Sequence, residues 1–330
     1  MALRVTRNLF SKLIALTAGI TLLIVAYNHN QKALYEISGT AYGTNWSISS
    51  TDYISDLHKN NIVSIINRID FVASNYKKDS EIALINFSQK NKYKVSTDLI
   101  NILTVAKDVE ESSDGFYNIM MGKVSGQLGF SPNFDNVQNQ VNVSSYEIDD
   151  QNYILYKNSS NWFDLSSIAK GYAVQAIHSY LIMNKIDNHL IDIGGEIIVN
   201  GKNINNNWRI GIQDPSSINN KAIKIITNQN SSFLAIATSG EYRNFKVDNY
   251  GNKISHTINP NTLKSINNEI LSVTVLHEFS ATYADAFATS FNAMGFEKAL
   301  DKSNELNIAS MFILDNDEIV FSNKWYDLQP

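Results

Sequence analysis

Helical segments and short β-rich runs follow one another along this chain without the regular strand, helix, strand alternation of a parallel α/β fold. Apolar residues recur at helical spacing around residues 57–73, 97–112, 167–186 and 281–300. Runs typical of strands lie at residues 189–195, 208–213, 233–239 and 270–278, and residues 310–322 read as a hairpin that turns at 315–317. No repeat is obvious in the sequence. The pattern predicts an α+β fold with mixed, mostly antiparallel sheets and packed helices.

The composition suits one large domain or two small ones and narrows the class of protein. The 330 residues are 44% hydrophobic and 11% aromatic, which is ample for a packed core. The net charge is −5 and lysine and arginine cluster only at the N-terminus, so we expect no nucleic-acid partner. The chain has no cysteine, which excludes disulfides, thiolate metal sites, a cysteine nucleophile and a lipidated cysteine.

The N-terminus has the pattern of a targeting segment. Arg4, Arg7 and Lys12 precede an apolar stretch at residues 13–27, after which the sequence turns polar. We therefore expect residues 1–30 to be a signal or membrane-anchor segment that exports the remainder to the periplasmic face of the inner membrane. A buried core helix is the alternative. No small-x-small cleavage site is visible, so cleavage and retention as an anchor both stay open.

A second motif runs from Asp164 to Tyr172 and reads as a strand end that enters a helix. Ser166 or Ser167 can cap that helix. Lys170 then falls in the first turn, at the wrong end for the helix dipole. A nearby anion would explain the lysine, and a solvated side chain is the alternative.

Asp285 and Thr289 are four residues apart and share one face of a predicted helix. That face is otherwise small and apolar, so both oxygens would point inward, where a buried carboxylate needs a partner. A hard cation such as Mg²⁺ fits, because it prefers oxygen ligands. The alternative is that Thr289 bonds its own helix and Asp285 pairs with an arginine.

A histidine stands in the short polar run at residues 255–260, Ser-His-Thr-Ile-Asn-Pro. A turn accounts for Pro260 but not for His256. Histidine is the side chain that gains and loses a proton near neutral pH, which suits a general base.

Eight sequence blocks occur in the order seen in one enzyme family: residues 39–44, 74–81 with Asn86, 114–116, 164–172, 194–196, 238–244, 255–260 and 284–289. From about residue 36 to the end, the chain resembles the ApbE-type FAD:protein FMN transferases. The resemblance implies a single catalytic domain over residues 36–330, built as a duplicated, T-fold-like α+β unit.

The resemblance also implies a chemistry. Members of the family take FAD as substrate, hold Mg²⁺ at its diphosphate and transfer the FMN half to a threonine or serine hydroxyl of an acceptor protein, releasing AMP. Acceptors include subunits of Na⁺-translocating quinone reductases and Rnf-type complexes. Matched to this chain, Asp285, Thr289 and the backbone carbonyl near Ser167 would bind the metal, and His256 would be the catalytic base. The positions that would contact the nucleotide are Tyr42, Tyr76, Phe116, Tyr117, Asn118, Asp164, Lys170 and Ile258.

The chain departs from the family's usual residues at several positions, which are Asn118, Met120, Leu128, Gln175, Asn259 and Leu263. Most of these surround the nucleotide, so they bear more on adenosine binding than on the reaction. Two other functions use the same residues. A Mg²⁺-dependent FAD pyrophosphatase would use water in place of the acceptor hydroxyl and yield FMN and AMP. A non-catalytic flavin-binding protein would have lost His256 or Asp285, and both are present.

Overall fold

The computed structural model describes residues 10, 12–23, 34–132, 145–217, 221–240, 245–247 and 253–330. Residues 12–23 form a helix, and the first strand of the domain begins at Tyr35. None of the helices in these described ranges is long and apolar enough to cross a membrane. The prediction that residues 1–30 form a signal or anchor stays a prediction.

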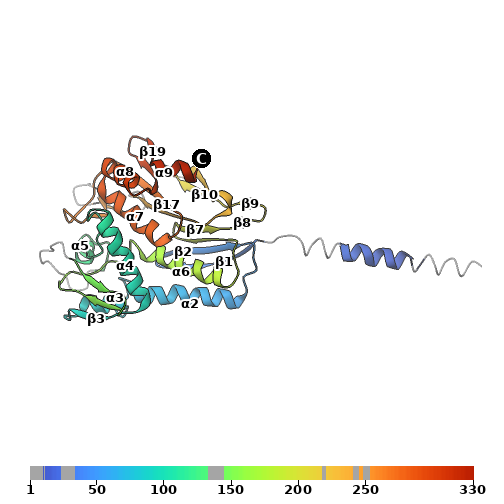
Figure 1. Cartoon of the computed structure of the whole chain (residues 1–330), viewed down its shortest axis with the longest axis horizontal. Coiled ribbons are helices and arrows are strands. Elements are labelled where there is room, and N and C mark those ends of the chain that lie inside the picture. Colours follow the sequence, from blue (N-terminus) through green and yellow to red (C-terminus); the bar gives the residue numbers. More distant parts are fainter. Residues whose placement is uncertain are drawn as a thin grey trace, which may run out of the picture.

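An eight-stranded sheet forms the centre of the domain (Figure 1). Its strand order is β1-β2-β6-β7-β12-β17-β18-β19, and every neighbouring pair is antiparallel. The strands are β1 (Tyr35–Ala41), β2 (Thr44–Ser50), β6 (His189–Ile193), β7 (Glu196–Asn200), β12 (Leu234–Gly240), β17 (Ile270–His277), β18 (Ala309–Leu314) and β19 (Ile319–Phe321). The predicted α+β class with antiparallel pairing is confirmed.

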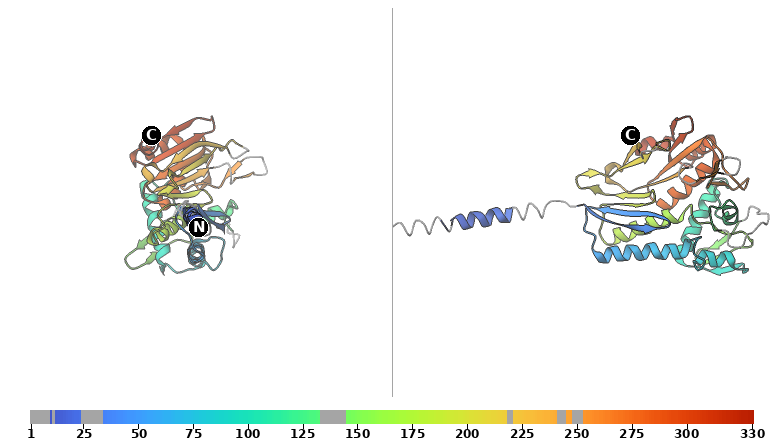
Figure 2. Two further views of the ribbon diagram at one scale, coloured as in Figure 1. Left: turned by 90° about the vertical axis from the view of Figure 1, so that its right-hand side faces the viewer. Right: turned by 180° about the vertical axis from the view of Figure 1, so that it is seen from behind.

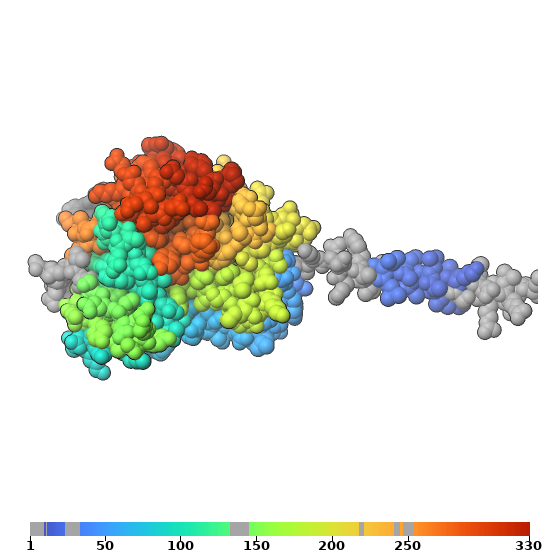
Figure 3. Space-filling view, in the orientation of Figure 1, coloured from blue at the N-terminus to red at the C-terminus, as the bar shows by residue number. Residues whose placement is uncertain are grey.

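The helices are α2 (Asp56–Ala73), α3 (Glu81–Phe87), α4 (Thr97–Ser112), α5 (Gly122–Gln127), α6 (Ala169–Met183), α7 (Ala281–Met294), α8 (Phe296–Glu305) and α9 (Asn323–Leu328). Serine side chains cap the first turns of α2, α3, α4 and α7, which explains where these helices begin. On the face shown in Figure 3, α4 (teal) lies against the C-terminal helices in orange and red.

The sheet contains the same arrangement twice. In the first half, β1 and β2 lead into a segment containing α2 and α6, followed by β6 and β7; in the second half, β12 and β17 lead to α7 and α8, then β18 and β19. Each half contributes four adjacent strands in the same relative order, and the halves join where β7 pairs with β12 and α6 packs on α7. The expected duplication is therefore present in the topology.

Both faces of the sheet are buried, by different partners. On one face, Ile198, Ala235 and Val273 pack against the long helices. On the other, Ile197, Val199 and neighbouring strand residues pack under a hairpin and α9. Figure 2 shows the layers from behind. The hairpin is β10 (Arg209–Gln213) with β11 (Ala222–Thr227), and the remaining short elements are β3 (Lys92–Lys94), β4 (Glu147–Asp149), β5 (Ile154–Tyr156), β8 (Lys202–Asn203), β9 (Asn206–Asn207), β13 (Phe245–Val247), β14 (Lys253–Ser255), β15 (Ile258–Asn259), β16 (Lys264–Ser265) and the 3₁₀ turn η1 (Gln229–Ser231).

The elements expected from periodicity all occur, with one correction. The apolar pattern at 281–300 predicts one helix, but the structure has two, because Gly295 adopts φ 80° between α7 and α8. A residue in this left-handed region ends a helix, and glycine reaches it without strain.

A histidine pair, in which His189 is fully buried and His178 is half-buried, joins α6 to β6. His189 Nδ1 lies 2.8 Å from the carbonyl oxygen of Ile186, so Nδ1 carries the proton and donates. His189 Nε2 must then accept from His178 Nδ1, 2.9 Å away. Burial lowers the pKa of both imidazoles to about 4. Both side chains are therefore neutral in the folded domain near neutral pH.

This pair predicts acid-sensitive stability. The two imidazoles take up a proton near pH 6.5 in the unfolded chain but only near pH 4 in the folded domain. The stability of the folded domain is therefore highest above pH 6.5, and it decreases as the pH falls toward 4 because protons bind the unfolded chain preferentially. Between about pH 7.5 and pH 5 the loss in unfolding free energy is on the order of 2 kcal/mol per histidine. Urea denaturation at both pH values measures it. The double variant His178→Gln, His189→Gln keeps hydrogen-bonding side chains without the titration, so an equally steep loss in that variant would contradict the assignment.

Candidate active site

A cavity of about 940 Å³ lies where the two halves of the fold meet. It is lined by the start of β7, the end of β12, the first turn of α6 and the inner face of α7. All twelve residues predicted to act at the site line it: Tyr42, Tyr76, Phe116, Tyr117, Asn118, Asp164, Ser167, Lys170, His256, Ile258, Asp285 and Thr289. They come from positions spread over nearly 250 residues of sequence, and the fold brings them to one place.

A contact between α6 and α7 forms the base of the cavity. The backbone N–H of Gly171 donates to Oδ2 of Asp285 at 2.9 Å. A Cβ atom at position 171 would lie 2.6 Å from Cβ of Asp285 and would collide with the carbonyl oxygen of Ala281, so only glycine allows this approach. The predicted cap by Ser166 or Ser167 is wrong: α6 has no side-chain cap, and Asp285 from α7 accepts from its first turn instead.

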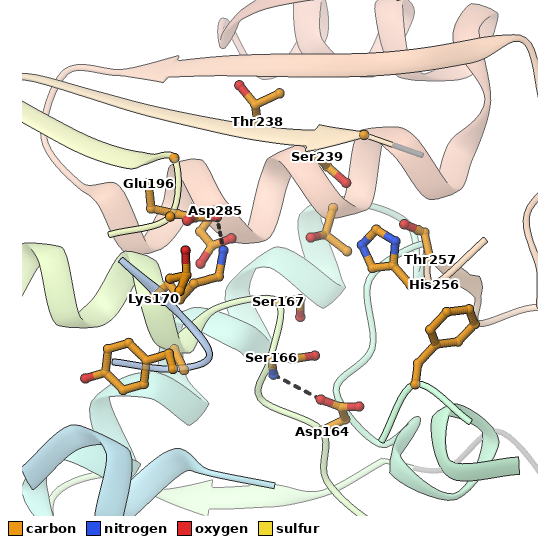
Figure 4. Close-up of a pocket in the computed structure, with 18 of the residues that line it drawn as sticks. Asp164, Ser166, Ser167, Lys170, Glu196, Thr238, Ser239, His256, Thr257 and Asp285 are labelled. Atoms are coloured by element: carbon orange, nitrogen blue, oxygen red, sulfur yellow. Dashed lines mark hydrogen bonds and ion pairs between the residues drawn. The ribbon is translucent and has the colours of Figure 1, made fainter. Parts of the chain in front are cut away.

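Lys170 points toward two carboxylates at this base (Figure 4). Its ammonium group lies 2.5 Å from Oε1 of Glu196. Burial alone would lower the pKa of Lys170, but Glu196 and Asp285 outweigh it and raise that pKa above the ordinary value. The solvated-lysine alternative is therefore wrong. The anions that offset the unfavourable helix dipole are present in the chain itself.

The donor set on α7 suits a hard divalent cation. Asp285 is 5% exposed, and burial raises its pKa despite the Lys170 charge. Oε2 of Glu196, next to this carboxylate, is buried without a hydrogen-bond partner. The protein therefore leaves at least one carboxylate oxygen at the base of the cavity without a donor. Among the described residues no three His, Asp or Glu side chains form a metal-binding group. The predicted ligands, a carboxylate, the Thr289 hydroxyl and a backbone carbonyl near Ser167, are all oxygens, and Mg²⁺ prefers oxygen ligands and often takes few of them from the protein.

His256 faces the cavity because its neighbours are turned inward. Ser255 and Thr257 are each 3% exposed, and Oγ of Ser255 accepts from the Thr257 N–H at 2.9 Å. From α7, Nδ2 of Asn292 reaches Oγ1 of Thr257 at 3.4 Å. The ring of Phe130 meets His256 edge-on, with centroids 6.2 Å apart. In Figure 4 His256 lies across the cavity from Lys170.

Three tyrosines of the lining have their hydroxyls engaged by the protein. Tyr42 OH donates to the carbonyl oxygen of Ile66 at 2.8 Å, Tyr76 OH donates to that of Phe130 at 2.8 Å, and Tyr117 OH lies 3.0 Å from Oγ of Ser167. Tyr42 adopts φ 52° in the turn between β1 and β2. Because their hydroxyls are engaged, Tyr42 and Tyr76 can offer a ligand mainly the faces of their rings, whereas Tyr117 is buried at 2% exposure.

Asp164 and Asn118 organise the neighbouring loops. Asp164 accepts from the Ser166 N–H at 3.0 Å and from Ser131 Oγ at 2.7 Å, and Asn75 also donates to it. Asn118 accepts from the Met120 N–H at 2.7 Å. Both side chains line the cavity and at the same time fix the backbone beside it.

Three of the departures from the family's usual residues take part in helix starts or turns beside the cavity. Gln175, where the family usually has Asp, accepts from the Ala281 N–H at 2.9 Å, at the start of α7. Asn259 accepts from the Asn261 N–H at 2.9 Å, as an aspartate would. Leu263, in place of a common glycine, adopts the left-handed φ of 58°. The turn after His256 is therefore built here at a cost in backbone strain.

Several lining residues were not assigned a role from the sequence. Glu196 belongs to the family block at residues 194–196, but its pairing with Lys170 depends on the contact between β7 and α6. Phe130 and Lys246 meet across the cavity mouth, with the ammonium 5.3 Å from the ring centre. Ser239 accepts from Asn292 at 3.1 Å. Glu196 and Ser239 lie in two of the eight family blocks, 194–196 and 238–244, whereas Phe130 and Lys246 lie outside them.

A family model described as the ApbE family matches residues 42–312. The chain belongs to the ApbE family. The matched range runs from Tyr42 at the cavity, past Asp285 and Thr289, into β18.

Curated relatives in the ApbE family are similar over nearly the whole chain. A protein named FAD:protein FMN transferase from Haemophilus influenzae is 28% identical, over 94% of each chain. A protein of the same name from Vibrio cholerae is 28% identical, over 92% of this chain and 94% of the relative. Among solved structures, the Vibrio cholerae flavin transferase ApbE has a TM-score of 0.77 at 27% identity and covers 90% of this chain and 100% of its own. The Pseudomonas stutzeri flavinyl transferase ApbE, at 21% identity, shares the fold with a TM-score of 0.78 over 90% of this chain and 96% of its own.

The Gly171 contact predicts an inverted mutational effect. Glycine to alanine in an exposed helix usually stabilises by about 0.5–1 kcal/mol, but Gly171→Ala should destabilise by about 1–3 kcal/mol because the added methyl overpacks α6 against α7. Urea denaturation measures the unfolding free energy. Ser179→Ala, at an exposed position of α6, is the matched control and should be nearly neutral. A Gly171→Ala variant as stable as the parent would show that the helices do not approach this closely.

Proposed function

We propose that this chain transfers the FMN half of FAD to a threonine or serine hydroxyl of an acceptor protein, in a Mg²⁺-dependent reaction that releases AMP. The observation that carries the proposal is the convergence of all twelve candidate residues in one cavity of about 940 Å³. That volume is at the upper end of the range of ligand pockets, as a dinucleotide needs. Curated relatives named FAD:protein FMN transferase support the same activity.

The reaction is attack on phosphorus. The acceptor oxygen forms a bond to the phosphorus of the FMN half, the bond from that phosphorus to the bridging oxygen breaks, and AMP leaves with the bridging oxygen. The hydroxyl proton goes to a base. Such transfers depend mainly on positioning and on neutralising the phosphate charge.

Each group of residues has a separate task in this scheme. Lys170 presents a cation at the base of the cavity, where an anionic diphosphate would compete with Glu196 for it. The rings of Tyr42, Tyr76 and Phe116 offer aromatic surface for the flat parts of the nucleotide. Asp285, Thr289 and the carbonyl near Ser167 would hold Mg²⁺, which when bound neutralises phosphate charge. His256 accepts the hydroxyl proton.

The residues that line the cavity do not identify the acceptor protein. We infer a subunit of a Na⁺-translocating quinone reductase or of an Rnf-type complex, as the family resemblance implies. Incubating the full chain with FAD, Mg²⁺ and such a subunit, followed by mass measurement, tests both parts of the proposal. An FMN-sized increment on the acceptor supports transfer. Free FMN and AMP without that increment would favour the pyrophosphatase.

His256→Ala is expected to keep FAD affinity and to slow FMN transfer by about 10²- to 10⁴-fold, because the aromatic and diphosphate contacts remain while the base is lost. His256→Asn is the sharper variant, since asparagine can hydrogen-bond in the loop but cannot accept the proton. Transfer rate and FAD affinity are measured for both. Near-normal transfer by the Asn variant would leave His256 only a structural role in the turn ending at Pro260.

The variant Asp285→Asn tests the metal-binding role of Asp285 separately from its structural role. The amide oxygen can still accept from Gly171, so the α6–α7 contact and the fold should persist, whereas the charge that attracts a cation is gone. We expect Mg²⁺ binding, measured by calorimetry with FAD present, to weaken strongly and transfer to fall by at least on the order of 10²-fold. Unchanged activity in this variant, or in the parent chain with EDTA, would remove the metal assignment.

A further inference from the structure

The end of the domain opposite the cavity carries a group of exposed apolar side chains, here named the apolar end. Their exposed fractions are 40% for Leu34, 65% for Tyr53, 67% for Leu57, 38% for Ile182 and 76% for Met183. They belong to the residue before β1, the loop before α2, the first turn of α2 and the last turn of α6. In Figure 1 these element ends lie on one side of the domain.

Local contacts hold these segments together. The rings of Tyr35 and Tyr53 meet edge-on with centroids 5.2 Å apart. Nδ1 of His58, next to Leu57, lies 2.8 Å from the hydroxyl of Tyr180, one turn before Met183. The apolar end is therefore a fixed surface built on packed secondary structure rather than a set of separate side chains.

The chain enters the domain at this surface from the apolar segment at residues 13–27. In the helix over residues 12–23, exposed apolar side chains occur at consecutive as well as separated positions: Leu13, Ile14, Leu16, Ile20, Leu22 and Leu23. A helix that is apolar on all sides needs an apolar environment. Six residues separate Tyr27 from Leu34, so the seven steps of chain between them reach at most about 25 Å.

We propose that the apolar end rests on the lipid surface that holds the N-terminal apolar segment. The short connection keeps this surface near any bilayer that contains residues 13–27, and this gives lipid a large advantage over a diffusing protein partner. The exposed charges around it carry no positive excess, since Lys59 and Lys185 stand against Glu36, Asp56 and Asp187. Attachment therefore depends on apolar contact and not on attraction to anionic headgroups.

This orientation fixes the height of the cavity. Helix α6 begins at the cavity with Lys170 and ends at the apolar end with Met183, a rise of about 20 Å. Strand β1 connects the same two ends in the opposite direction, from Tyr35 at the apolar end toward Tyr42 in the cavity. The cavity is then held about 20 Å from the lipid surface, where an acceptor must present its hydroxyl.

The test uses the absence of native cysteine. Full chain carrying Leu57→Cys, or Leu84→Cys as control, is labelled with an environment-sensitive dye and reconstituted in phosphatidylcholine vesicles. Leu84 is 57% exposed on α3, beyond the other end of α2, and matches Leu57 in residue type and exposure. We expect a quencher on the lipid headgroup to quench the label at 57 severalfold more than the label at 84, and high salt to leave the difference unchanged.

Equal quenching at both positions would overturn the proposal. If the label at 57 is shielded in the absence of vesicles, and more so at higher protein concentration, then a second copy of the chain covers this surface. That result would also overturn the proposal. In a further variant, Leu57→Asp with Met183→Asp, a label placed by Tyr53→Cys should lose its quenching while activity in detergent is unchanged. Because the quenching measurement does not involve FAD, its outcome is independent of the proposed enzymatic function.

Discussion

The hydrogen bond from the Gly171 N–H to the Asp285 carboxylate is the contact on which the rest of the site depends. It joins the first turn of α6 to the middle of α7, and there is no space for a side chain between them. Because α6 belongs to the first half of the fold and α7 to the second, this contact fixes how the halves meet. Shifting α6 outward would displace Lys170 and Ser167 together from Asp285 and Thr289.

The charges at this seam do not cancel. Lys170 supplies one positive charge, whereas Glu196 and Asp285 supply two carboxylates, and burial raises the pKa of both. A buried excess of negative charge is costly unless it is protonated or paired with a cation. Such an arrangement favours binding of a cation, as the proposed Mg²⁺-dependent phosphoryl transfer would require. The arrangement is thus better explained by ligand binding than by fold stability.

The sequence was sufficient for features that depend on local pattern and insufficient for those set by packing. Helix periodicity located α2, α4, α6 and α7, and alternation located β6, β10, β12 and β17. The extra break at Gly295 depends on one residue's φ, and the cap of α6 comes from a carboxylate 114 positions away in sequence, which no local rule detects. Glu196 lies in one of the eight family blocks, but the sequence does not show that it pairs with Lys170, because that contact is set by the fold. Gln175 looked like a departure, yet its amide oxygen caps α7.

Duplication explains why the site lies where it does and what each half contributes. The first half provides Lys170, Glu196 and the loop at Asp164, while the second provides Asp285, Thr289 and His256. Lys170, the two carboxylates and His256 come together only where β7 pairs with β12 and α6 packs on α7, so neither half alone forms the site. The same arrangement makes α6 a spacer between the cavity and the apolar end. A single helix can therefore determine both the chemistry at its first turn and the position of that chemistry relative to a surface at its last turn.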